Sequence, residues 1–154
     1  MKTHIVIIGA GRLGRSAAQI LEQGGHRFTM VSRGEAIPKA EITWLTVPDR
    51  EIQNVSILVP KGGVVLHASG ALTIAPLNGH EHAGSLHPLM TFPGPEFGLP
   101  KADQIPAAVA GTSEAVAGAK QLADWLGFTP FEVPGSRALY HAAAVTAGNF
   151  ASLL

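Results

Sequence analysis

The sequence predicts an α/β fold built on a doubly wound, mainly parallel β-sheet, and three observations carry this prediction. Short apolar runs alternate with segments whose apolar residues recur at helical spacing. The first apolar run leads directly into a glycine-rich turn that opens a helix. Hydrophobic residues make up 46% of the 154 residues and charged residues 14%, so the chain can bury the core of one domain.

The opening segment predicts a strand over residues 4–8 and a helix over residues 12–23, joined by G-x-G-x-x-G. Gly9 permits the sharp turn, Gly11 lets a pyrophosphate approach the backbone, and Gly14 lets the helix pack closely on the strand. The free N–H groups and the dipole of the helix start favour phosphate. A purely structural glycine turn is the alternative. Strand, turn and helix together are the context of a dinucleotide site, predicted at Gly9, Ala10, Gly11, Arg12, Leu13 and Gly14.

A second strand is predicted over residues 27–31, and its tip indicates which dinucleotide is bound. An acid at this tip binds the ribose 2′-hydroxyl of NAD, whereas a nearby arginine accommodates the 2′-phosphate of NADP. Here the strand ends in Ser32 and Arg33, with no acid at the tip. A guanidinium suits forked recognition of phosphate. We therefore predict NADP, with Ser32 and Arg33 at the 2′-phosphate; two ordinary turn residues are the alternative.

The segment after Arg33 is too short for a standard α/β unit. About ten residues precede the next strand, predicted over 42–47, whereas a crossover that includes its helix needs at least about 10–12 residues and a further strand needs more. We therefore expect the sheet to be shortened after its second strand, with one α/β unit deleted or reduced to a linker.

The remaining elements follow from apolar runs and their stop signals. The loop over residues 89–105 is rich in proline and glycine, so it holds neither a helix nor a central strand. Strands are predicted over 64–68, 83–88, 107–110 and 128–133. Helices are predicted from Asp49 through Val55, over 72–77 and over 114–126, the last capped by Thr112 or Ser113.

From Ser136 to Leu154 the pattern is helical and apolar on most sides. Such a helix needs burial against another element, and the chain ends before supplying one. We therefore predict a nucleotide-binding domain over residues 1–134 and the start of a helical domain over residues 135–154.

Several motifs spread from end to end of the chain carry a family resemblance. They are residues 9–14 (GAGRLG), 45–49 (LTVPD), 67–72 (HASGAL), 84–92 (GSLHPLMTF), 110–111 (AG) and 139–144 (LYHAAA). In these motifs the chain resembles the Rossmann-like family described as domain of unknown function 2520. That family is similar to pyrroline-5-carboxylate reductases, F420-dependent NADP oxidoreductases and 6-phosphogluconate dehydrogenases. The resemblance implies an NADP-binding domain followed by a helical dimerisation domain, with the substrate held between the two.

The resemblance also implies where the nicotinamide end of the coenzyme lies. Thr46, Val47 and Pro48 match the loop that passes the nicotinamide ribose in relatives, although a simple strand-ending turn is the alternative. Ser69 and Gly70 follow the next strand, where ligands gather in open α/β sheets. Ser69 is expected to hydrogen-bond the substrate or the carboxamide, or else to cap a helix.

Three further residues are candidates for catalysis or substrate binding. Hydride transfer to a carbonyl or imine needs a proton, and histidine is the side-chain type suited to supply one, so His87 is a candidate; a buried structural histidine is the alternative. His141 and Asn149 are eight residues apart on the last helix, a little over two turns, so they share a face. Related dehydrogenases place a lysine and an asparagine there, and this chain has no lysine at that place.

Composition excludes several classes of function. The net charge is zero with no basic stripe, which argues against nucleic acid, and no apolar run approaches a membrane span. The absence of cysteine rules out thiol chemistry and fits a reducing cytoplasm, where we expect the protein. A metal-dependent hydrolase that uses His80, His82 and His87 is a further alternative, but no Cys or Asp cluster completes such a site, so we predict no metal.

The sequence thus predicts an NADP-dependent oxidoreductase that transfers a hydride to a small carbonyl or imine. It is expected to form a homodimer through its C-terminal helix and to be incomplete without the helical domain. The alternative is a non-catalytic NADP-binding or dimerising scaffold.

Overall fold

The computed structural model describes residues 2–99, 105–133 and 136–152, with backbone alone at residues 137 and 146–152. Within these residues the chain forms a seven-stranded sheet in the order β2-β1-β3-β4-β5-β6-β7. Neighbouring strands are parallel except for β5 and β6, which run antiparallel. The strands are β1 (Ile5–Ile8), β2 (Phe28–Val31), β3 (Ile42–Leu45), β4 (Val64–His67), β5 (His82–Pro88), β6 (Pro106–Gly111) and β7 (Thr129–Glu132).

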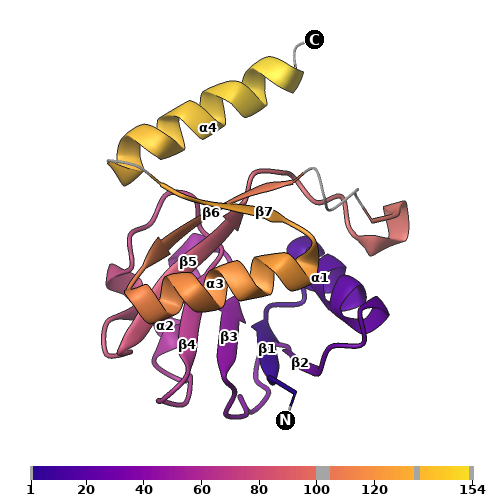
Figure 1. The fold of residues 1–154 in the computed structure, drawn as a ribbon, viewed down its shortest axis with the longest axis vertical. Coiled ribbons are helices and arrows are strands. Elements are labelled where there is room, and N and C mark those ends of the chain that lie inside the picture. Colours follow the sequence, from indigo (N-terminus) through magenta and orange to yellow (C-terminus); the bar gives the residue numbers. More distant parts are fainter. Residues whose placement is uncertain (1, 100–104, 134–135, 153–154) are drawn as a thin grey trace.

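Both faces of the sheet are covered, and every residue of β1 and β3 is buried. Helices α1 (Arg12–Gln23) and α3 (Ser113–Leu126) pack on the face that carries Ile5 and Ile7 (Figure 1). The opposite face, with Val6 and Ile8, is covered by α2 (Ile52–Ser56) and the segment around the 3-10 turn η2 (Ala75–Leu77). The doubly wound α/β prediction is therefore confirmed.

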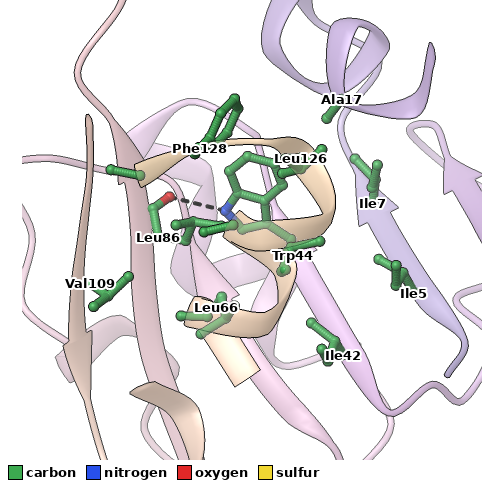
Figure 2. Close-up of a cluster of buried hydrophobic side chains, with 14 of the residues drawn as sticks. Ile5, Ile7, Ala17, Ile42, Trp44, Leu66, Leu86, Val109, Leu126 and Phe128 are labelled. Carbon is green, nitrogen blue, oxygen red and sulfur yellow. Dashed lines mark hydrogen bonds between the residues drawn. The ribbon is translucent and has the colours of Figure 1, made fainter. Parts of the chain in front are cut away.

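Trp44 lies at the centre of the larger core (Figure 2). Its side chain is fully buried, and its indole Nε1 donates a hydrogen bond to the Leu86 carbonyl at 3.2 Å. This bond satisfies the polar atom of the largest core side chain and joins β3 to β5 across β4.

The connection from β2 to β3 contains no helix, as its length predicted. It carries the chain across β1 on the face covered by α2, where Ile37 and Ala40 pack against the core. Consequently β2 forms the edge of the sheet, and the strand that a full doubly wound sheet places outside it is absent from the described residues.

The structure refines several predicted elements. The 3-10 turn η1 (Asp49–Glu51) precedes α2, and the helix expected over 72–77 is only the turn η2, with Pro76 in its first positions. The loop expected over residues 89–105 contains a third 3-10 turn, η3 (Pro95–Phe97). Thr112 caps α3 by accepting from the Ala115 N–H, and Gly127 ends α3 in the left-handed conformation.

The last helix, α4 (Arg137–Ser152), stands apart from the sheet beyond β6 and β7 (Figure 1). Tyr140 at its base contacts the rings of Phe131 and His87, at centroid distances of 6.3 and 6.1 Å. Across the part of the chain that is described, none of the helices has both the length and the apolar character needed to cross a bilayer.

Candidate functional site

The carboxyl ends of β1, β2 and β3 lie level with one another. Ile8 is in register with both Val31 and Leu45, so the residues that follow these three form one row. The Gly9 N–H donates to the Val31 carbonyl, and the Thr46 N–H donates to the Ile8 carbonyl. The register therefore brings together the glycine turn, the tip of β2 and the loop after β3, three of the segments predicted to bind a coenzyme.

A cavity of about 400 Å³ opens at this edge of the sheet. Its lining comprises residues 8–11, 31–35, 37, 46–48, 51, 55 and 58. The predicted coenzyme residues Gly9, Ala10, Gly11, Ser32, Arg33, Thr46, Val47 and Pro48 all belong to it. Arg12, Leu13 and Gly14 continue from it into the first turn of α1, whereas Ser69 and Gly70 lie outside its lining.

The glycine turn has the geometry that close phosphate approach requires. Gly9 has a φ of +117°, which side chains rarely adopt. A Cβ on Gly14 would collide with the Gly9 carbonyl and lie 2.7 Å from Thr46 Oγ1, whereas one on Gly11 would meet nothing within 4 Å. Gly11 is the N-cap residue of α1, and no side chain caps this helix end. The first-turn N–H groups of α1 therefore remain available to a phosphate.

Two carboxylates lie at the tip of β2, where the sequence reasoning found none. The Ser32 N–H donates to Glu35 Oε2 at 2.6 Å, and Arg33 donates to both carboxylate oxygens of Glu51 at 2.8 and 3.0 Å. Gly34, with a φ of +84°, turns the chain so that Glu35 folds back onto Ser32. The glycine after Arg33 was the available signal, because a turn there brings residue 35 back to residue 32.

Ser69 holds its own loop and joins it to the start of η1. Its hydroxyl donates to Asp49 Oδ2 at 2.8 Å and accepts from the N–H groups of Ala71 and Leu72, each at 3.1 Å. The side chain is 5% exposed. These contacts are those of a turn-forming serine, and they add a partner, Asp49, that the sequence analysis did not connect with Ser69.

His67, at the end of β4, supports the same loop from inside the core. It is fully buried; its Nδ1 accepts from the Ser69 N–H at 3.1 Å, so the proton lies on Nε2, which donates to the Thr73 carbonyl at 2.9 Å. Both nitrogens therefore fix the loop that carries Ser69 and Gly70. His67 belongs to a motif quoted above, but no local pattern indicated this role.

His87, near the end of β5, lies directly against Gly70. A Cβ on Gly70 would stand 2.5–2.9 Å from three atoms of the His87 ring, so a larger residue there would displace this ring. His87 Nδ1 is hydrogen-bonded to the Tyr140 hydroxyl at 3.0 Å. The structure thus brings together Gly70, His87 and Tyr140; the last was quoted in a motif but not predicted as a site residue.

The two predicted site residues on α4 are His141 and Asn149. His141 follows Tyr140, and its buried Nδ1 has no hydrogen-bond partner within the described segments. Asn149 belongs to α4, but its side chain lies outside the described residues.

The three histidines considered for a metal are not clustered. His82 begins β5 and His87 lies near its other end, while His80 Nε2 is hydrogen-bonded to the Ser56 carbonyl at 2.9 Å. Among residues 2–99, 105–133 and 136–152, no group of three or more metal-binding side chains is placed to hold an ion.

A bidentate ion pair ties η3 to the first turns of α1. Arg15 donates to both carboxylate oxygens of Glu96, at 3.1 and 3.2 Å. A hydrogen bond from the Glu96 backbone N–H, and then the bond from Arg15, hold the pKa of this carboxyl below its usual value. Arg12 adds a further attraction. The positive charge at the start of α1 is thereby partly balanced within the protein.

Comparison with known families and structures relates this geometry to other proteins. A family model described as "Domain of unknown function (DUF2520)" matches residues 105–154. This match confirms the predicted resemblance to the DUF2520 family over these residues, which make up about a third of the chain. No curated protein sequence matches the chain.

Solved structures share the fold at low sequence identity. Protein TM1727 from Thermotoga maritima is 24% identical, with a TM-score of 0.75 over 95% of this chain and 64% of its own. A candidate NADP oxidoreductase from Bacteroides fragilis is 21% identical, with a TM-score of 0.79 over 98% and 68%. Prephenate dehydrogenase from A. aeolicus, solved with hydroxyphenyl propionate and NAD+, is 14% identical, with a TM-score of 0.71 over 97% and 69%.

The chain spans 64% of the length of the Thermotoga protein and slightly more of the other two. At these identities the similarity establishes the fold alone. The chain therefore has the Rossmann-type fold that NAD(P)-dependent oxidoreductases use, and its cavity lies at the carboxyl edge of the sheet where such folds bind ligands.

Proposed function

We propose that this chain binds NADP(H) in the 400 Å³ cavity and forms the coenzyme-binding part of an oxidoreductase. The observation that carries the proposal is the uncapped start of α1 at Gly11, which opens onto a cavity that continues to the tip of β2. A pyrophosphate at the helix start places an adenosine over β2 in folds of this kind.

The lining of the cavity supports this orientation of the coenzyme. Ile37, Val47, Val55 and Leu58 provide apolar walls suited to an adenine ring. Ser32 and Arg33 lie at the rim and supply donors for a phosphate. Ile37 comes from the short linker between β2 and β3, so this linker replaces part of the wall that a complete α/β unit would supply.

The nicotinamide half is proposed to follow the loop after β3 toward Gly70 and His87, which lie at the carboxyl ends of the next two strands. When bound, the reduced nicotinamide supplies a hydride to a small carbonyl or imine. His87 would hold the proton that the substrate oxygen or nitrogen takes up, and the Tyr140 hydroxyl orients its ring. His141 and Asn149 are proposed to face the same substrate from α4.

The test is a fluorescence titration with NADPH and NADH. We expect NADPH to bind more tightly than NADH and Arg33→Ala to weaken NADPH about tenfold, because a guanidinium–phosphate contact is lost. Arg27→Ala is the matched control, since Arg27 is also exposed but lies at the amino end of β2, whereas the cavity lies at the carboxyl ends of the strands. Equal affinity for the two coenzymes, or no effect of Arg33→Ala, would remove the NADP assignment; binding of neither would remove the dinucleotide site.

A second candidate function is a non-catalytic NADP-binding or dimerising module. It is favoured by α4, which stands apart from the sheet and exposes Leu139 (72%) and Val145 (46%). We propose that residues 1–134 form the coenzyme domain and that α4 begins a helical domain through which two copies associate. The absence of cysteine fits a cytoplasmic protein. Tight NADPH binding without NADPH oxidation by any of a panel of carbonyls and imines would favour this candidate.

A further inference from the structure

We propose that Glu35 is a specificity-determining residue whose carboxylate occupies the anion position at the tip of β2 and competes with the 2′-phosphate of the coenzyme. This inference rests on the proposed NADP(H) site. It adds that the protein carries its own competitor for the phosphate, and that this competitor weakens the preference for NADPH over NADH.

The first step is the position of the carboxylate. Glu35 Oε2 accepts from the Ser32 N–H at 2.6 Å, a short, charge-assisted bond. The turn that makes this possible is closed by a hydrogen bond from the Glu35 N–H to the Ser32 carbonyl at 3.2 Å. An anion at this N–H lies directly after the last residue of β2, where the coenzyme ribose is read in dinucleotide folds.

The second step is the state of Arg33. Its guanidinium donates to both oxygens of Glu51, although the Arg33 side chain is 85% exposed. Exposed ion pairs contribute little to stability, so Arg33 can exchange this partner readily. Both residues predicted to bind the 2′-phosphate thus donate a hydrogen bond to a carboxylate of the same chain, Ser32 through its backbone N–H and Arg33 through its guanidinium. All four residues line one cavity.

The third step is the difference between the two coenzymes. A 2′-phosphate carries one to two negative charges near neutral pH, so it must displace Glu35 from the Ser32 N–H and meets repulsion from Glu51. A 2′-hydroxyl can instead donate to the Glu35 carboxylate where it stands. Glu35 therefore penalises NADPH and not NADH.

The experiment measures the Kd of NADPH and of NADH by fluorescence titration for the wild type, Glu35→Gln and Glu35→Ala. Removing the charge is expected to lower the Kd of NADPH about three- to tenfold. The Kd of NADH should stay within about twofold of the wild type or rise, because NADH loses an acceptor for its 2′-hydroxyl. Glu22→Gln is the matched control, because Glu22 is an exposed glutamate at the far end of α1. Its ratio of the two Kd values should equal that of the wild type.

The possible outcomes separate this inference from the proposed function. An unchanged ratio of the two Kd values in both Glu35 variants, with NADPH still bound, overturns the inference and leaves the NADP(H) site standing. A ratio that shifts equally in Glu22→Gln also overturns it, because the effect is then one of net charge. Binding of neither coenzyme to any variant overturns the site and the inference together.

Discussion

Two glycines of the same motif have opposite surroundings, which allows the structural and binding roles of the turn to be tested separately. A Cβ at Gly11 would enter open space beside the cavity, and the Gly11 φ of −74° suits any residue. A Cβ at Gly14 would collide with the Gly9 carbonyl and crowd Thr46 Oγ1. Gly11 is therefore free of internal packing demands, whereas Gly14 is fixed by packing.

We predict that Gly11→Ala folds with a stability within about 0.5 kcal/mol of the wild type but weakens NADPH binding at least about tenfold, because the new methyl group occupies phosphate space. Gly14→Ala should instead lower the free energy of unfolding by about 2 kcal/mol or more through overpacking. Urea unfolding followed by circular dichroism, together with coenzyme titration, checks both. A Gly11→Ala protein that binds NADPH normally would contradict pyrophosphate binding at this turn.

Residue types in the sequence predicted some contacts of the site and not others. Gly9, Ser32 and Thr46 meet in one cavity as expected, because each follows a strand of a parallel sheet and the register aligns those ends. The Glu35 carboxylate was missed because Gly34 reverses the chain, and the turn geometry sets which atoms meet. The contact between His87 and Tyr140 joins segments far apart in the chain, which no local pattern reports.

At the scale of elements, β3 is fixed by a side-chain hydrogen bond as well as by its backbone hydrogen bonds to β1 and β4. Trp44 fills the core between β3 and α3 and donates its indole N–H to the Leu86 carbonyl of β5 (Figure 2). Loss of this donor would leave a buried carbonyl without this partner, and loss of the second ring would leave a void.

Trp44→Phe is predicted to lower the free energy of unfolding by about 2 kcal/mol. Trp125→Phe is the matched control: Trp125 is only partly buried on α3 and packs its ring against His26, so a loss below about 1 kcal/mol is expected. Urea unfolding followed by circular dichroism measures both without relying on tryptophan emission. Equal losses in the two variants would show that the bond to Leu86 contributes nothing measurable.

The order of the strands and helices could largely be predicted, because the patterns that indicate them lie within short stretches of sequence. These patterns are apolar runs, glycines that end a helix, and apolar residues at helical spacing. Helix α1 begins and ends at the predicted residues, and the missing unit between β2 and β3 followed from linker length alone. The helix expected over 72–77 shrank to a 3-10 turn because Ser69 and His67 hold the preceding loop in a turn. That constraint comes from a buried side chain of another element, so the segment's own propensity did not reveal it.

At the scale of the whole molecule, α4 stands apart from the sheet and exposes apolar side chains. It contacts the body through Tyr140, which lies between His87 and Phe131. Leu139, which directly precedes Tyr140, and Val145, farther along the helix, expose apolar surface. A helix of this composition gains most when its apolar side chains pack against another helix, and a second copy of the same helix is the partner proposed above.

Leu139→Lys is therefore predicted to shift the protein from dimer toward monomer, weakening association at least about tenfold, because a charge at an apolar contact must be desolvated or expelled. Analytical ultracentrifugation over a range of concentrations measures the dissociation constant. Ile57→Lys is the control, since Ile57 is about as exposed, at 70%, but directly follows α2 and not α4. Its dissociation constant should match the wild type.

NADPH should bind both variants as tightly as the wild type, because neither residue lines the cavity. A wild-type protein that remains monomeric at all concentrations, or a dimer equally weakened by Ile57→Lys, would exclude association through α4.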